Sequence, residues 1–486
     1  MALTSTLLIQ QLRADFEKLL GLVTGPEAQT ATLDQMERSL FRQVLRFGFK
    51  LLQLFVTTRV QAESHASQPG VGKTQLPYHS QKPIDYFSIF GKLSLARAYF
   101  YRAGQPGVCP LDQALSLPQR CYSDLLTESA ELLAVDSAYD KSLQVLTRLL
   151  GVRVPELALE TQVAEHSQTV QAFYRQQPKF PHTEEGHILI AQADGKGVPR
   201  VRRETLAPKV RLSKGDKKTR KKEAIATAVY TIAPYPRTPG DVVNALFKKG
   251  SAPPRRPVPC HKQVFASLDG KDAAFKRLAK WVRRRAGPHI RTRVALTDGA
   301  EPLQKHRRAK LPGFTLVLDI IHAAEHLWKA GTALYGETDV PRAAWVETQM
   351  RDILSSHSDR VIERLERQAS DLPKSSSVGK VLGQVAHYLR RNTAYMDYAD
   401  YLRHGWPIGT GVVEGTCRHL VKDRMELSGM RWTVPGASAL LALRAVNENG
   451  DWEAFHDYRR KQPHKELYGT SMNTRWLHHV EQLEIN

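Results

Sequence analysis

The spacing of apolar and polar positions divides the chain into helical outer parts and a centre with the pattern of a sheet. In residues 1–66, leucine and phenylalanine recur at helical spacing, which predicts a helical hairpin. Residues 86–102 alternate apolar and polar, as a β-hairpin does. Two helical stretches, 139–150 and one beginning near Pro155, flank a glycine turn and form a candidate helix-turn-helix. Any helical hairpin has this spacing, so DNA binding by this pair is left open.

Five apolar, β-branched segments follow in the centre of the chain. They cover residues 186–194, 223–232, 263–268, 293–298 and 314–319. An amphipathic helix over 272–285 precedes the fourth, and a second helix precedes the fifth. Three antiparallel strands followed by two parallel strands added through helices is the order of the ribonuclease H-like fold. We expect an α/β protein, with a ribonuclease H-like mixed five-stranded sheet interrupted by an all-helical insertion, and with helical N-terminal domains.

These patterns predict seven segments along the 486 residues. They are an N-terminal helical region (1–66), a β-hairpin and turn region (67–110), a helix-turn-helix-like region (111–182), the first part of a catalytic core (183–321), a helical insertion (322–404), the second part of the core (405–435) and a helical tail (436–486).

Charge adds a class of partner to this picture. The chain has 70 Lys and Arg against 49 Asp and Glu, a net charge of +21, which indicates a nucleic acid more than a neutral ligand. Residues 200–222 alone hold eleven cations and two acids, a surplus of nine. Such a run is either a solvated loop or a segment that grips phosphates.

Composition also excludes some classes of protein. The four cysteines, at 109, 121, 260 and 417, form no CxxC pair, which argues against a disulfide scaffold or a cysteine-based zinc ribbon. No apolar run reaches the length of a membrane span, and the first twenty residues resemble an amphipathic helix more than a signal peptide. We therefore expect a cytoplasmic protein with no membrane partner.

Acidic residues follow two of the predicted strands. Asp194 ends the first strand and Asp298 the fourth, and these two strands are neighbours in a sheet of the predicted order. Paired carboxylates hold the divalent cations of phosphodiester chemistry, Mg²⁺ or Mn²⁺. Glu414, after the glycine-rich turn 405–411, is the candidate third acid, with Asp319 and Glu325 as rivals. Each aspartate precedes a glycine, so an ordinary Asp-Gly turn is the alternative.

The segment after the fifth strand holds two overlapping motifs. Asp319 and His322 form D-x-x-H, while His322, Glu325 and His326 form the H-x-x-E-H pattern of one class of zinc peptidases. A zinc metallopeptidase is thus an alternative, although it leaves the surplus charge unexplained. A histidine on a helix surface is the other reading.

Several long strings, in order, resemble the ISKra family of bacterial insertion-sequence transposases, which belongs with the Mutator-like DDE transposases. The resemblance covers about 87–455 and is densest over 194–432. The strings are DGKGVP, KEAIATAVYTI, RTPGDVVNALF, VALTDGAEPLQ, LVLDIIHAAEHLWKA, GWPIGTGVVEG and HLVKDRMELSGMRW.

The resemblance implies an enzyme that binds the terminal inverted repeats of its element and performs metal-dependent DNA strand cleavage and strand transfer into target DNA. It places the catalytic, metal-binding acids at Asp194, Asp298 and Glu414, and a supporting motif at Asp319 and His322. It also implies a homodimer on DNA, nucleoid-associated when bound. A catalytically decayed repressor of the element is the alternative, and the presence of all three acids argues against it.

Basic residues near these acids are candidate phosphate contacts. Those singled out are Lys196, Arg202, Arg203, Lys217, Lys218, Lys221, Lys222, Arg418 and Arg431. For Lys196 and Arg418 the alternative is an ion pair with a neighbouring acid. For Arg431 the alternative is the end of a helix in the core, and for the residues of the 200–222 run it is a solvated loop.

Overall fold

The structure is a computed structural model, and it describes residues 4–64, 70–71, 74–201, 221–249, 255–337 and 340–468. The chain forms two compact units. The first comprises Met1–Thr169 and Trp452–Asn486, and the second comprises Val170–Asp451. The predicted tail 436–486 is therefore divided between the units, whereas the other predicted boundaries stay predictions.

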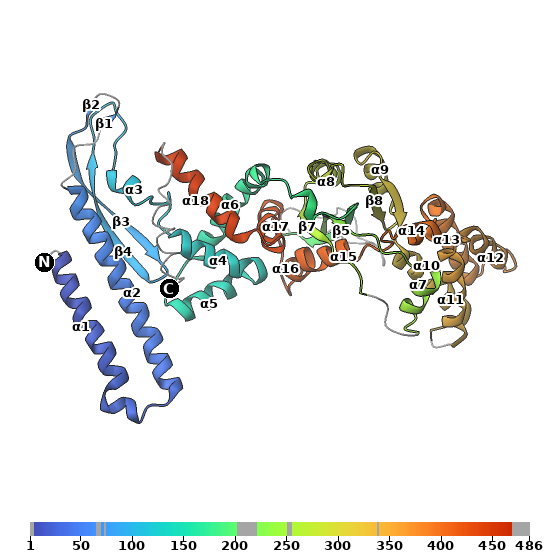
Figure 1. Ribbon diagram of the computed structural model, residues 1–486, viewed down its shortest axis with the longest axis horizontal. Helices are drawn as coiled ribbons and strands as arrows, with labels where there is room; N and C mark the ends of the chain where they lie inside the picture. The colour runs from blue at the N-terminus through green and yellow to red at the C-terminus, as the bar shows by residue number, and fades with distance from the viewer. Residues whose placement is uncertain are drawn as a thin grey trace. The chain divides into compact units, whose positions relative to one another are not determined.

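The first unit begins with a helical hairpin and a β-hairpin, as the apolar spacing predicts (Figure 1). Helix α1 (Ser5–Thr24) contacts α2 (Leu33–Ser64), and α2 also contacts β4 (Gly91–Phe100). Strand β3 (Tyr78–Ser88) pairs antiparallel with β4 through a tight turn. Two short strands, β1 (Gly70–Val71) and β2 (Thr74–Gln75), pair with each other.

Helices complete the first unit. They are α3 (Pro110–Ala114), α4 (Asp124–Asp136), α5 (Tyr139–Leu150), α6 (Glu156–Gln176), whose last turns belong to the second unit, and α18 (Trp452–Tyr468). The predicted helix–turn–helix segment is confirmed as two helices, because α5 ends at Gly151 with φ of +73°. Its DNA binding stays a prediction.

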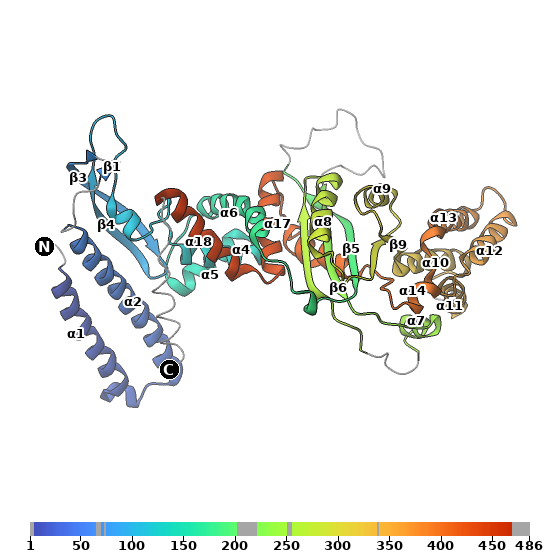
Figure 2. The same ribbon diagram turned by 45° about the horizontal axis from the view of Figure 1, so that its top comes forward.

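The second unit is built on a five-stranded mixed sheet (Figure 2). Its strands are β5 (Ile188–Pro199), β6 (Lys221–Ile232), β7 (Cys260–Ser267), β8 (Thr292–Thr297) and β9 (Thr315–Leu318). The spatial order is β7-β6-β5-β8-β9. The first three strands in the chain are antiparallel neighbours, whereas β8 and β9 join the far edge in parallel with β5. An α/β fold is therefore confirmed, with all five strands close to their predicted positions.

Several helices pack against or flank this sheet. They are α8 (Lys271–Arg285), α9 (Glu301–Lys310), α15 (Gly411–Thr416), the π-helix η5 (Cys417–Lys422), α16 (Asp423–Met425) and α17 (Val434–Glu448). Helix α8 contacts β6, and α17 contacts β7. Helix α15 contacts both β5 and β6, which places Glu414 beside the central strand.

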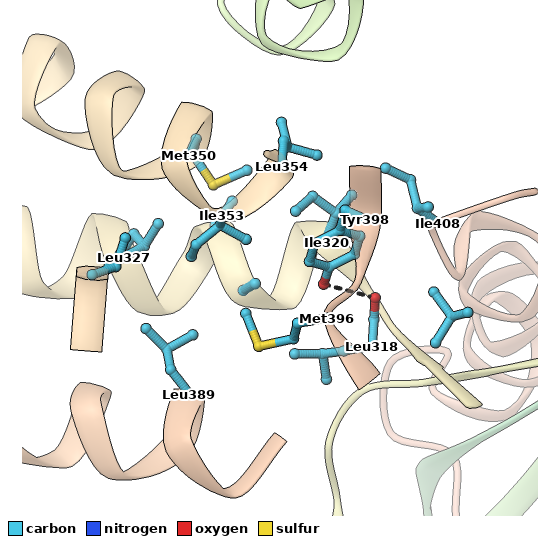
Figure 3. Close-up of a cluster of buried hydrophobic side chains, with 14 of the residues drawn as sticks. Leu318, Ile320, Leu327, Met350, Ile353, Leu354, Leu389, Met396, Tyr398 and Ile408 are labelled. Carbon is cyan, nitrogen blue, oxygen red and sulfur yellow. Dashed lines mark hydrogen bonds between the residues drawn. The ribbon is translucent and has the colours of Figure 1, made fainter. Parts of the chain in front are cut away.

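The predicted helical insertion is confirmed as helical. It contains α10 (Ile320–Tyr335), α11 (Val340–Leu354), α12 (Ser358–Ser370), α13 (Ser377–Asn392) and α14 (Tyr398–Arg403), and α7 (Pro239–Leu246) packs against it. One hydrophobic core joins the insertion to the sheet, since Leu318 of β9 belongs to the same buried cluster as Leu327, Met350 and Leu389 (Figure 3). The buried Tyr398 hydroxyl donates a hydrogen bond to the Leu318 carbonyl, at 2.9 Å. The insertion is therefore anchored to the strand that precedes Asp319.

No helix in the described part of the chain is long and apolar enough to cross a membrane.

Candidate metal and active site

Three acids lie just past the parallel pairing of three strands: Asp194 on β5, two residues after its last pair with β8, Asp298 directly after β8 and Asp319 directly after β9. In the β5–β8 ladder Gln192 lies opposite Leu296, an offset of 296 − 192 = 104 residues. The same offset, 298 − 194 = 104, separates the two predicted catalytic aspartates. If the register is continued past the last pair, the two aspartates fall opposite each other. This register agrees with the sequence expectation that both acids share one sheet edge, and their joint role in catalysis stays a prediction.

The two aspartates differ in local structure. Asp194 pairs with Ala226 of β6, because β5 continues to Pro199 against β6 after its pairing with β8 has ended. It is thus inside a strand and not in an Asp-Gly turn. Asp298 does lie in a turn, where its Oδ1 accepts a hydrogen bond from the Ala300 N–H at 3.0 Å. The alternative of an ordinary Asp-Gly turn therefore holds in part for Asp298 and does not hold for Asp194.

A buried arginine joins the two strand ends. Arg307 of α9 donates hydrogen bonds to the Ala193 carbonyl and to the Thr297 hydroxyl, both at 2.5 Å. Those two acceptors immediately precede Asp194 and Asp298. Burial lowers the pKa of Arg307 to about 10, while the negative charges of the two aspartates act against that shift. A cation under both carboxylates holds their strand ends together and offsets part of their repulsion.

The third acid reaches this edge through a helix that the central strand holds. The Oε1 atom of Gln192 accepts a hydrogen bond from the Val413 N–H, at 2.9 Å, one residue before Glu414. Upstream, Gly405 has φ of +74°, and a Cβ there would lie 2.3 Å from the Tyr235 nitrogen. Only glycine combines this backbone conformation with such a close approach to Tyr235, which explains why a glycine begins the predicted turn 405–411.

The helix after Glu414 is irregular in a way that brings it close to Asp194. Its next turns form the π-helix η5, whose carbonyls at His419 and Leu420 accept hydrogen bonds from the buried Arg444. Cys417, at the start of η5, directs its thiol at Asp194 Oδ2, with an S–O distance of 3.5 Å. Burial, then Asp194 and more weakly Glu414, raise the pKa of this thiol.

Glu414 also belongs to a tight polar cluster with Asp319 and His322. The His322 Nδ1 lies 2.7 Å from Asp319 Oδ2 and 4.0 Å from Glu414 Oε1. The Thr410 hydroxyl lies 2.5 Å from an oxygen of each carboxylate. The hydrogen bond to Asp319 raises the pKa of His322 to about 9, so that His322 is a cation at neutral pH.

The two carboxylates of this cluster carry different proton affinities. Burial raises the pKa of Glu414. Burial would also raise the pKa of Asp319, but hydrogen bonds from His322 and Thr410 outweigh it and lower the value. The Thr410 hydroxyl has one proton for the two carboxylate oxygens that lie beside it, so this pair of carboxylates is short of donors at Thr410. A divalent cation would remove this shortage, and the oxygen-rich donor set suits Mg²⁺ or Mn²⁺.

Within the described residues, the group of three ligand atoms that lie within 4.8 Å of one another is Asp319, His322 and Glu414. The predicted set of Asp194, Asp298 and Glu414 shares Glu414 with this group but is more open. Asp319 and His322, predicted as a supporting motif, thus form part of the same centre. The structure does not bring His326 into it, because the His326 ring stacks on Tyr388 with centroids 3.7 Å apart. This arrangement does not favour the H-x-x-E-H zinc interpretation.

The predicted phosphate contacts have varied surroundings. Arg418 and Arg431 are exposed, Lys196 and Lys222 are half-buried on β5 and β6, and Lys221 forms an ion pair with Glu426. Trp432, beside Arg431, pairs with the end of β5 and is buried. Arg202, Arg203, Lys217 and Lys218 lie outside the described residues.

Sequence reasoning missed three positioning residues: Gln192, Arg307 and Thr410. Gln192 left a signal, since it is the lone polar residue in the apolar run ILIAQA that precedes Asp194. Arg307 left none, because it stands in a basic helix among exposed cations. Thr410 lies in the glycine-rich turn, where a hydroxyl has many ordinary uses.

Comparison with protein-family models and with curated proteins finds no match for this chain.

Proposed function

We propose that the protein is a DDE transposase of an insertion sequence, with Asp194, Asp298 and Glu414 as its catalytic acids. The proposal rests on one arrangement of these three acids. Asp194 and Asp298 are separated by the same number of residues as the paired positions of the parallel strands β5 and β8, and Gln192 of β5 holds the helix of Glu414 against that strand. The sheet order β7-β6-β5-β8-β9, third to first and then fourth and fifth, is that of the ribonuclease H-like fold.

The residues have separate tasks in this reaction. Mg²⁺ or Mn²⁺, when bound, polarises the phosphate and the attacking oxygen. Asp194 and Asp298, fixed through Arg307, provide carboxylates at the scissile phosphate. Asp319, Thr410 and His322 orient Glu414 and set its proton affinity.

The first step hydrolyses a phosphodiester at each end of the element. Water forms a new bond to phosphorus, and the 3′ oxygen leaves and takes up a proton. In the second step the free 3′-OH attacks a target phosphodiester, loses its proton and displaces another 3′ oxygen. Both are in-line displacements that need the two reacting oxygens held in line with phosphorus. The surplus of 21 positive charges suits a DNA partner, bound by a homodimer in the cytoplasm or nucleoid.

The test is a cleavage assay with purified protein, Mg²⁺ or Mn²⁺, and duplex DNA carrying the sequences that flank the coding region. We expect Asp194→Asn, Asp298→Asn and Glu414→Gln each to abolish cleavage and keep DNA binding. Glu325→Gln, at the exposed rival acid of α10, is the matched control and should cleave normally. Full activity in Asp298→Asn would refute the proposed acids, and binding without cleavage by the wild type would favour the repressor alternative.

A further inference from the structure

The first unit contains a basic groove that no part of the proposed centre uses. Helix α2, the β3–β4 turn and the end of α5 line it, and we call it the α2 groove. Its cations are Arg38, Arg42, Arg46, Lys50, Lys92 and Arg148, and its other lining residues are mostly apolar. No acidic side chain is among these lining residues. The groove is therefore a concave surface of one charge sign.

Half of these cations already have an acidic partner outside the groove. Arg38 pairs with Asp34, Lys50 with Asp15, and Lys92 with Asp85. The other half, Arg42, Arg46 and Arg148, have no acidic oxygen within 4 Å among the described residues. Like charges four residues apart on a helix repel each other, so Arg42 and Arg46 cost stability unless an anion binds them.

The groove is also amphipathic. Phe41, Phe90 and Leu149 are 49%, 36% and 54% exposed along it. An arginine series beside exposed rings is the surface that contacts phosphates and the apolar edges of sugars and bases. From Arg38 to Lys50, at 1.5 Å per residue, α2 spans about 18 Å, the length of about five base pairs. Charge and dimensions both fit a nucleic acid backbone.

We propose that the α2 groove binds the phosphate backbone of duplex DNA, with Arg42, Arg46 and Arg148 as its free phosphate contacts. The inference rests on the proposed function only for the choice of DNA as the polyanion. It assigns a DNA contact to the N-terminal helical hairpin, in addition to the candidate helix-turn-helix and the basic segment 200–222.

The test compares the full-length protein with the triple variant Arg42→Gln, Arg46→Gln, Arg148→Gln. Binding of a fluorescent duplex is measured by anisotropy from 50 to 300 mM salt. Three lost phosphate contacts should flatten the slope of log K against log salt by about 2.7 and weaken binding about tenfold or more. The matched control is Arg13→Gln, Lys18→Gln, Arg102→Gln, three exposed cations of the same unit outside the groove, which should change the slope much less.

The outcomes separate the groove from the proposed function. A triple variant with the wild-type slope would overturn the groove, whatever the cleavage assay shows. If the triple variant no longer forms a dimer in sedimentation experiments, and its slope of log K against log salt is unchanged, the groove proposal would also be overturned. The surface would then be assigned to contact with a second copy of the chain. A flattened slope in a protein that cleaves no DNA would support the groove and overturn the transposase activity.

Discussion

Gln192 accepts a hydrogen bond from the Val413 N–H, at 2.9 Å, and so joins the central strand to the helix of Glu414. Its amide nitrogen donates to the Tyr230 hydroxyl on β6, at 3.2 Å. The Gln192 side chain is fully buried, and both of these polar contacts fix its orientation. Asp194 follows two residues later on the same strand, so the position of Glu414 relative to Asp194 depends on this amide.

We predict that Gln192→Leu lowers DNA cleavage about 10- to 100-fold and leaves DNA binding unchanged. The substitution removes an acceptor next to a proposed metal-binding residue, and partners of that kind typically contribute this much. Cleavage and binding are measured on the same preparations, normalised to the folded fraction. Gln263→Leu, at a buried glutamine on β7, is the control for a buried amide lost elsewhere in the sheet. Equal cleavage losses in the two variants would contradict a positioning role.

Arg307 supports a second prediction, because its side chain contacts the residues before both aspartates. Arg307→Met should lower the unfolding free energy by about 3 kcal/mol, since two hydrogen bonds from a charged donor are lost. It should also reduce cleavage per folded molecule, because Asp194 and Asp298 are no longer held together. Denaturant unfolding and the cleavage assay measure the two effects.

The control for this change is Arg285→Met. Arg285 is equally buried and pairs with Glu185, just before β5 at the opposite end of that strand, at 2.7 Å. Its loss should destabilise the protein by a similar or larger amount, because it leaves a buried charge unpaired. If Arg285→Met impairs cleavage per folded molecule as much as Arg307→Met does, the effect on cleavage reflects stability alone.

The strands and the acids were predictable for a shared reason. Burial on both faces makes each central strand a continuous apolar run, and an acid directly after such a run stands out. The contacts that assemble the centre lack a local signal, because their partners are remote: Arg307 and Ala193 are 114 residues apart, and Val413 and Gln192 are 221 apart. The closeness of Glu414 to His322 likewise depends on where the insertion returns the chain to the sheet. A single sequence carries no record of that geometry.

A third prediction concerns metal at the centre. At 100 times its dissociation constant, Mn²⁺ should stabilise the wild type by about 2.7 kcal/mol. Glu414→Gln should reduce this increase in unfolding free energy, because Glu414 belongs both to the predicted triad and to the cluster with Asp319 and His322. Thermal unfolding with and without Mn²⁺ measures it. His326→Gln is the control and should keep the gain, and stoichiometric zinc that this substitution removes would revive the peptidase alternative.

The last prediction concerns acid stability of the first unit. Burial, followed by Arg459, His166 and Arg460, lowers the pKa of His456 to about 3, although an oxygen of the buried Glu131 lies 3.8 Å from its Nε2. An unfolded histidine has a pKa of about 6.5, so between these values the unfolded chain binds a proton that the folded chain does not. The unfolding free energy should therefore fall as pH drops below 6.5, by up to about 1.4 kcal/mol per pH unit. Denaturant unfolding at pH 4 to 7 should show a shallower fall in His456→Gln than in the wild type or in the exposed-site control His79→Gln. An identical fall in all three proteins would mean that His456 is protonated in the folded state, paired with Glu131.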